Sequence, residues 1–257
     1  MPHDRPARAP WRRGEPYAYL RHVERAMFAW EWLRRTDAYR AAWQNLRTSC
    51  EHNWSRTAHS FGLVEFLSPT LSAMIARPMW RAGHDPRVIA AAACTGDATE
   101  DDRLDIRQLA NLAAVAINEE DIEHWRIGTA ARSLRLDVRA GTLLGGPTAL
   151  QFELRGLARV RTQLGPLAEL IDLGTLGPGP PISVGDAWVA RWILELRTAD
   201  ALASGANQQD IARGLFSHAV SDAGWRLDTD SARSRTRRLI RAAEARLAEP
   251  LDDYWFR

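Results

Sequence analysis

The chain has 257 residues, 46% hydrophobic and 26% charged, a composition that fits a globular protein and excludes a fully disordered chain. Its 34 basic residues face 32 acidic ones, so the net charge of +2 does not by itself direct the protein to nucleic acid or to a membrane surface. Every basic residue is arginine, which excludes mechanisms that need a Schiff-base lysine or a phosphate-loop lysine.

Cysteine content and hydropathy bear on the compartment. Cys50 and Cys94 are the only cysteines, too few for a disulfide framework, so we expect a reducing, cytoplasmic location. The longest apolar run, residues 88–94, is far shorter than the roughly 20 residues of a membrane span. Residues 1–16 are charged and proline-rich without an apolar stretch, unlike a secretory signal. We therefore expect no membrane partner.

The N-terminal part predicts a short arm followed by helices. Residues 1–15 carry prolines and arginines without a periodic apolar pattern, which indicates a flexible basic arm. Apolar residues at helical spacing begin near Pro16, and Thr36-Asp37 has the residue types of a helix N-cap. Residues 50–111 are broken by three X-Pro steps, and the sequence does not predict their topology.

Residues 112–173 switch to an alternating pattern and then return to a helical one. Residues 134–139 and 150–155 alternate strictly between apolar and polar side chains, which is typical of strands with one buried face. Short, turn-rich connections favour an antiparallel meander. We predict four strands, at 114–117, 122–127, 134–138 and 150–154. A helix that we expect to cover the sheet follows, with apolar residues at Leu157, Val160, Leu164, Leu167 and Ile171.

A glycine- and proline-rich stretch marks a domain boundary. Four glycines and three prolines within residues 174–186 exclude regular structure there. Beyond it, three helical segments, the second short and the third basic, outline a helix-turn-helix unit. The predicted fold class is α+β and mainly helical: N-terminal helices, a small antiparallel four-stranded sheet and a C-terminal helix-turn-helix domain. The expected division is an arm at 1–15, a helical and sheet domain at 16–173, a linker at 174–185 and a helix-turn-helix domain at 186–257.

Basic charge is concentrated on the last long helix. Residues 231–247 hold six arginines against Glu244 alone, a net charge of +5. The whole segment from residue 186 onward carries eleven arginines and eleven acids, so its net charge is zero. A focused charge of this kind matters more for binding a polyanion than the total does.

A period of about 100° per residue divides this helix into two faces. Arginine forks match the guanine edge and also clamp phosphates, and the start of a recognition helix lies deepest in a major groove. We therefore predict DNA contacts by Ser234, Arg235 and Arg238 at base edges, and by Arg233, Arg237 and Arg241 at phosphates. The inward face is expected at Ala232, Thr236, Leu239, Ile240, Ala243 and Leu247. A solvated cationic face, paired with Asp228, Asp230 and the acids at 252 and 253, explains the pattern equally well.

Four stretches occur in the order of a known family: WEWLRRTDAYRAAW (30–43), RSLRLDVRAGTLLGGPTALQFELRGLARV (132–160), ASGANQQDIARGLF (203–216) and RSRTRRLIRAAEA (233–245). Together they resemble the RovC-like transcriptional regulators. That family includes activators of type VI secretion operons and FseA-type activators of the excision of integrative and conjugative elements. The resemblance extends from about residue 16 to residue 247.

The resemblance implies a two-part regulator. Its N-terminal portion, 16–173, is expected to self-associate into a homo-oligomer, with a hexamer among the expected states. Its helix-turn-helix, 186–247, is expected to bind double-stranded promoter DNA, and activation to involve contact with RNA polymerase. The family's basic helix carries over onto Arg233, Arg235, Arg237, Arg238 and Arg241.

The C-terminus departs from the family, and a rival function follows from that departure. Family members commonly finish with a Gly-Gly-Tyr-Arg-like tail, whereas residues 249–257 here are EPLDDYWFR. These acids and aromatics could contact another protein or shield the basic helix. The rival to a DNA-binding activator is an anti-activator of the same family, which binds another regulator protein and not DNA.

Other candidate sites point to structure rather than chemistry. Cys50, His52 and His59 resemble a partial metal set, but the spacing is not that of a zinc finger and no fourth ligand follows, so we expect no metal. Nucleophile elbows, phosphate loops and metalloprotease motifs are absent from the sequence, so we expect no enzyme activity and no cofactor. A structural ion-pair cluster is expected at Glu31, Arg34, Arg35, Tyr39 and Arg40. Four tryptophans on apolar stripes are expected in the core: Trp30, Trp43, Trp188 and Trp192.

Overall fold

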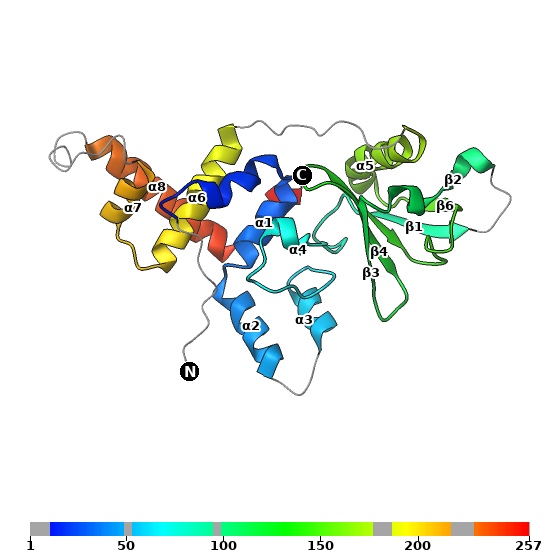
Figure 1. The fold of residues 1–257 in the computed structure, drawn as a ribbon, viewed down its shortest axis with the longest axis horizontal. Helices are drawn as coiled ribbons and strands as arrows, with labels where there is room; N and C mark the ends of the chain where they lie inside the picture. Colours follow the sequence, from blue (N-terminus) through cyan, green and yellow to red (C-terminus); the bar gives the residue numbers. More distant parts are fainter. Residues whose placement is uncertain (1–10, 49–52, 95–98, 177–186, 217–228, 257) are drawn as a thin grey trace.

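The computed structural model describes residues 11–48, 53–94, 99–176, 187–216 and 229–256. The chain forms a helical body beside a curled β-sheet (Figure 1). The α-helices are α1 (Arg25–Leu33), α2 (Asp37–Thr48), α3 (Trp54–Ser60), α4 (Ala73–Ala76), α5 (Leu157–Leu176), α6 (Ala187–Ala203), α7 (Gln208–Leu215) and α8 (Thr229–Ala248). Short 3₁₀ helices are η1 (Glu15–His22), η2 (Glu100–Asp102), η3 (Ile106–Leu109) and η5 (Asp253–Phe256). The strands are β1 (Ile89–Cys94), β2 (Arg103–Leu104), β3 (Ala113–Ile117), β4 (Glu123–Gly128), β5 (Ser133–Val138) and β6 (Thr148–Glu153).

The core of the helical body is built from both ends of the chain. Phe28 of α1 stacks on Trp255 of η5, with ring centroids 5.8 Å apart, and meets Trp192 of α6 edge to face at 5.1 Å. Ala243 of α8 is buried in the same cluster. Since α1 is buried on nearly every side, it forms the centre of this body.

The predicted start of α2 is confirmed, whereas the helix predicted to begin near Pro16 is interrupted. The hydroxyl of Thr36 accepts a hydrogen bond from the Tyr39 amide at 3.3 Å, and α2 begins at Asp37, so the predicted N-cap is confirmed. The helical pattern that starts near Pro16 is interrupted, because Glu24 is extended between η1 and α1. Its amide donates to the carbonyl of Ala130 at 2.9 Å, a tertiary contact that a continuous helix would remove.

The sheet has six strands and is mixed, so the expected four-stranded antiparallel sheet is wrong. The strand order is β2-β6-β1-β5-β4-β3. β3, β4 and β5 form the predicted meander, but β1 separates β5 from β6, and it runs parallel to β5 and antiparallel to β6. The sequence of β1, IAAAAC, carries no alternation that would predict a strand pairing. Gly141, with a φ of +69°, lets the chain pass close to β1, since a Cβ there would lie 2.5 Å from the Ala93 carbonyl oxygen.

Helix α5 covers the sheet with a different face from the one expected. Leu170 and Leu173 are buried against the sheet, and Gln163 donates to the Val88 carbonyl at 2.6 Å. The predicted stripe lies largely outside: the exposed fractions of Leu157, Leu164 and Ile171 are 93%, 54% and 56%.

Hydrophobic clusters group the elements by body rather than by order in the chain. One cluster joins η1 and α1 to α6, α8 and η5, and a second joins the sheet to α5. Helix α5 continues through Leu176, so the expected absence of regular structure is wrong at residues 174–176. The rest of the expected linker lies outside the described residues, and the division at 174–185 stays a prediction. Among the described residues, no helix has the length and apolar character needed to cross a bilayer.

Candidate nucleic-acid interface

Three helices, α6, α7 and α8, pack together at one end of the helical body (Figure 1). Their shared cluster contains Ala201, Ile211 and Trp11, with Ile240 of α8 packed against it. Trp11 belongs to the expected basic arm, yet Arg197 of α6 donates to its carbonyl at 2.8 Å. The described end of the arm is therefore held against α6.

The turn between α6 and α7 is fixed by hydrogen bonds. Gly205, with a φ of +83°, lies just after the end of α6. Asn207 and Asp210 form a capping box at the start of α7. The Asn207 side chain accepts a hydrogen bond from the Asp210 backbone amide at 2.9 Å, and the Asp210 carboxylate accepts one from the Asn207 backbone amide at 3.1 Å. Gly214 leaves room for the Trp11 ring, which a Cβ at that position would overlap.

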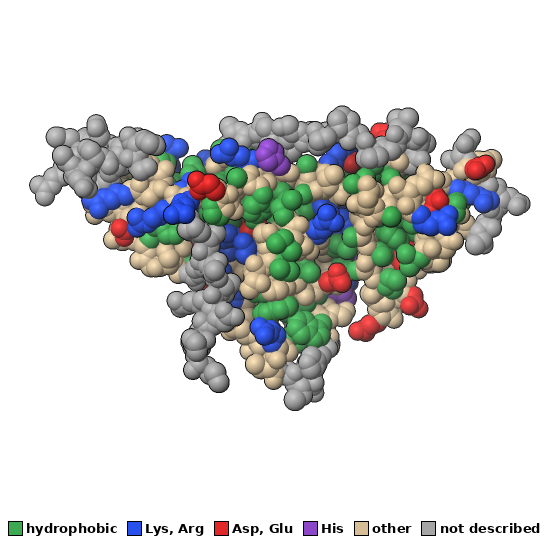
Figure 2. Space-filling view, viewed as in Figure 1, with side chains coloured by type: hydrophobic (Ala, Val, Ile, Leu, Met, Phe, Trp, Pro, Cys, Tyr) green, Lys and Arg blue, Asp and Glu red, His purple; other side chains and the backbone are tan. Residues whose placement is uncertain are grey.

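The two faces of α8 lie where the periodicity predicts. Thr236, Leu239 and Ala243 are buried, and Ala232, Ile240 and Leu247 are half-buried. The opposite face is solvent-exposed, and blue arginine side chains are visible at this end of the molecule (Figure 2). All six predicted contact residues lie on the exposed face: Arg233, Ser234, Arg235, Arg237, Arg238 and Arg241.

Helix α7 positions part of this face through two residues that the sequence did not single out. The Arg235 guanidinium carbon lies 4.4 Å from the centre of the Phe216 ring, in a cation–π contact. The Gln208 side-chain amide donates to the Arg233 carbonyl at 3.3 Å. Because a guanidinium carries five N–H donors, Arg235 in this contact can still donate hydrogen bonds. The sequence signal for both residues was their place in the stretch 203–216, which resembles the family.

Partners for the basic face were expected among nearby acids and in the C-terminal tail. Asp228 and the side chain of Asp230 lie outside the described residues. Among the side chains that are described, the ion pairs found do not include Arg237, Arg238 or Arg241. The tail instead enters the core: Trp255 and Phe256 are buried, and the tail aromatics contact Arg246.

The other candidate sites have structural surroundings. Glu31 is buried and accepts hydrogen bonds from Arg34 and Arg35, in agreement with the expected ion-pair cluster. Cys50 and His52 lie outside the described residues, and within the described part no three potential metal ligands come together. Trp30 and Trp192 are buried as expected and Trp43 is half-buried, but Trp188 is 55% exposed, which corrects its core assignment.

Comparison with protein families agrees with this geometry. Residues 10–64 match a family described as a proteobacterial transcriptional regulator-like domain. Residues 178–249, which include α6, α7 and α8, match a RovC family described as "T6SS, Transcription factor, DNA binding domain". These matches define a transcriptional regulator with a C-terminal DNA-binding domain, a class that is generally non-enzymatic. More specifically, the two matches support a RovC-like regulator, in agreement with the resemblance found in the sequence. Comparison with curated proteins gave no significant match.

Proposed function

We propose that this protein is a sequence-specific regulator that binds double-stranded promoter DNA in the cytoplasm through a helix-turn-helix made of α6, α7 and α8. The observation that carries the proposal is the exposed face of α8, on which all six predicted contact residues lie. The focused charge of +5 at 231–247 favours a polyanion as its partner. The target would be an operon of a secretion system or a mobile element, and the protein its activator.

The position of each side chain along α8 supports separate roles. Ser234 and Arg235 lie in the second turn of α8, toward the end of a recognition helix that contacts base edges, and Arg238 lies about one turn further along. Arg233, Arg237 and Arg241 flank them and are placed to clamp phosphates. One basic helix binds weakly and with strong dependence on salt, so a single copy is not enough for a tight operator complex.

Self-association would give the affinity for DNA that one copy lacks, and the exposed side of α5 is a surface suited to it. Leu157, Leu164 and Ile171 are exposed at intervals of seven residues along one face. Arg161 lies toward the start of this face and Asp172 toward its end, so an antiparallel pair of α5 helices would bring opposite charges together. A homo-oligomer would raise the effective concentration at repeated half-sites, from which the regulator would contact RNA polymerase.

Alanine substitutions on α8 test the DNA proposal. After selection of an operator from random DNA, Arg235→Ala or Arg238→Ala should weaken binding by about 1–3 kcal/mol and relax one base position. Arg237→Ala or Arg241→Ala should weaken all sequences alike and flatten the salt dependence. Fluorescence anisotropy at two salt concentrations measures both effects, and Arg47→Ala, an exposed arginine on α2, is the matched control.

Unchanged affinity in all four variants would overturn the assignment of α8. A wild-type protein that selects no DNA, but captures a regulator protein from the host, would instead favour the anti-activator. The net-neutral charge of the segment from residue 186 onward is the observation that favours this second candidate.

A further inference from the structure

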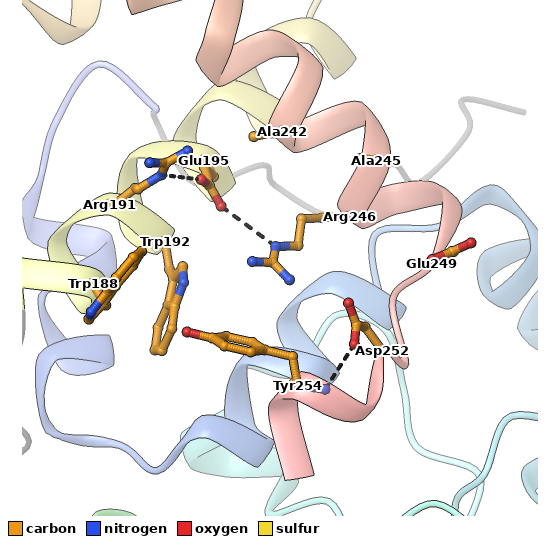
Figure 3. A pocket seen from close by; sticks show the side chains of 10 residues that line it. All are labelled: Trp188, Arg191, Trp192, Glu195, Ala242, Ala245, Arg246, Glu249, Asp252 and Tyr254. Atoms are coloured by element: carbon orange, nitrogen blue, oxygen red, sulfur yellow. Dashed lines mark hydrogen bonds and ion pairs between the residues drawn. The ribbon is translucent and has the colours of Figure 1, made fainter. Parts of the chain in front are cut away.

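A cavity of about 460 Å³ lies between α6, the C-terminal part of α8 and η5. Figure 3 shows aromatic side chains on one side of it and a buried carboxylate on the other. Trp188, Trp192 and Tyr254 supply the aromatic wall, and Glu195 supplies the carboxylate. The function proposed above does not use this cavity.

Glu195 is an unusual group to find in such a wall. It is only 2% exposed, and its Oε1 accepts a hydrogen bond from Arg191 at 2.9 Å. Its Oε2 has no hydrogen-bond donor among the described residues, and Nε of Arg246 lies 3.7 Å from it. A buried carboxylate oxygen without a donor is costly, so the cavity presents an unfilled acceptor.

The aromatic wall already holds cations of the chain itself. The Arg246 guanidinium carbon lies 5.4 Å from the centre of the Tyr254 ring and 4.4 Å from that of Trp255. The Arg25 guanidinium carbon lies 5.3 Å from the centre of the Tyr254 ring. Trp188, in contrast, presents an exposed indole at the mouth of the cavity. Electron-rich ring faces attract cations, so this wall favours a positively charged guest.

The charge of the lining has the sign that suits a cation. Glu195, Glu249 and Asp252 outnumber Arg191 and Arg246, which leaves a net charge of −1 around the cavity. Only Glu195 among the three acids is buried, so it is the acid that a guest would neutralise in a low-dielectric setting.

We propose that this cavity binds a small organic cation, a guanidinium or primary ammonium on a short aliphatic chain. Its head group donates to Glu195 Oε2 in the place now approached by Arg246, and its aliphatic chain lies against Trp188. Arg246 is displaced toward solvent when the guest enters. Since Arg246 is five residues beyond Arg241 on α8, occupancy of the cavity acts on the helix that carries the basic face.

Calorimetry on the full-length chain with butylguanidinium as the probe tests this inference without any DNA. Saturable binding with one site per chain is expected, whereas uncharged butylurea and anionic butyrate should not bind. Glu195→Gln and Trp188→Ala should each weaken butylguanidinium binding by about tenfold, through loss of the charged acceptor or of the outer wall. Glu244→Gln, an exposed acid on α8 outside the cavity, is the matched control and should leave binding unchanged.

The Trp188 variant keeps the test decisive if Glu195→Gln fails to fold, because Trp188 is exposed and its removal leaves the core intact. Absence of butylguanidinium binding would overturn the inference. So would binding that Trp188→Ala does not weaken, or preferential binding of butyrate. None of these outcomes bears on whether α8 binds DNA, so failure here is distinguishable from failure of the proposed function.

Discussion

Arg35 ties two distant parts of the chain together. Its guanidinium donates two parallel hydrogen bonds to Asp200 of α6, both of 2.9 Å, and a third to Glu31 at 2.5 Å. The Tyr17 hydroxyl also donates to Asp200, at 2.6 Å. All of these groups are buried, so each charge depends on its partner for stabilisation.

Replacement of Arg35 by alanine should therefore be strongly destabilising. Arg35→Ala leaves Asp200 buried without a counter-charge, and we expect a loss of about 3–5 kcal/mol in the free energy of unfolding. Urea denaturation followed by tryptophan fluorescence measures it. Arg47→Ala, on the exposed end of α2, should stay within about 0.5 kcal/mol of the wild type. Equal stabilities for the two variants would show that the buried pair contributes nothing.

Glu31 gives the same cluster a pH dependence. Burial raises the pKa of this carboxyl, but the charges of Arg34 and Arg35 outweigh burial and lower the pKa to about 2, from an ordinary 4.5. Because the folded pKa lies below the unfolded one, the stabilisation is complete above pH 4.5 and is lost as the pH falls toward 2. The difference corresponds to about 3 kcal/mol. Urea unfolding from about pH 5 downward should show a gap between wild type and Glu31→Gln that closes with acid; parallel profiles would contradict it.

Sequence patterns find local pairings of this kind and miss distant ones. Arg34 and Arg35 follow Glu31 by three and four residues at the C-terminal end of α1, so their cluster was predictable. Asp200 could not be assigned to it, because 165 residues separate it from Arg35. Tyr39, which the prediction included, instead donates to the Leu67 carbonyl at 2.7 Å.

At the scale of whole elements, periodicity located strands and the buried side of α8, but it did not predict how much of each strand is buried. Both faces of β5 are buried, including the polar side chains of Arg135 and Asp137, so the expected single buried face is wrong for this strand. β3, β4, β5 and β6 were all found, and α8 buries the expected side. β1 is an alanine-rich strand with neighbours on both edges, so neither its pairing nor its direction was visible in the sequence. Helix α5 has apolar residues on two sides, and periodicity alone cannot tell which side meets the sheet.

The outer side of α5 leads to a test of self-association. Leu164→Glu places a charge in the centre of the exposed stripe and should reduce the molecular mass measured by light scattering after size exclusion, with the fold unchanged by circular dichroism. Ile117→Glu is a matched control: both side chains are 54% exposed, but Ile117 lies on the edge strand β3, far from α5 in the chain. A mass that falls equally in both variants, or in neither, would count against α5 as the interface.

At the scale of the whole molecule, helices α6 and α8 of the matched DNA-binding region share a hydrophobic core with the N-terminal helices. The family match at 178–249 suggests a separable unit, yet α6 and α8 share their core with η1, α1 and the C-terminal η5. The tail beyond the matched region therefore serves the fold: Trp255 packs on Phe28 and Trp192 and holds Arg246 over its ring. Composition predicted two domains in sequence, and only tertiary packing reveals that the ends of the chain meet.

Trp255→Ala should consequently destabilise the whole helical body. Removal of a fully buried tryptophan leaves a large cavity, for which a loss of about 3–5 kcal/mol is expected. Residues of α1, α6 and α8 all contact this ring. We therefore expect the helical body to unfold in one transition at a lower temperature, with loss of DNA binding. Trp188→Ala, which removes an exposed ring from α6, should leave the melting temperature nearly unchanged. If Trp255→Ala melted the N-terminal helices while α6 and α8 stayed folded and bound DNA, the shared core would not be the unit of stability.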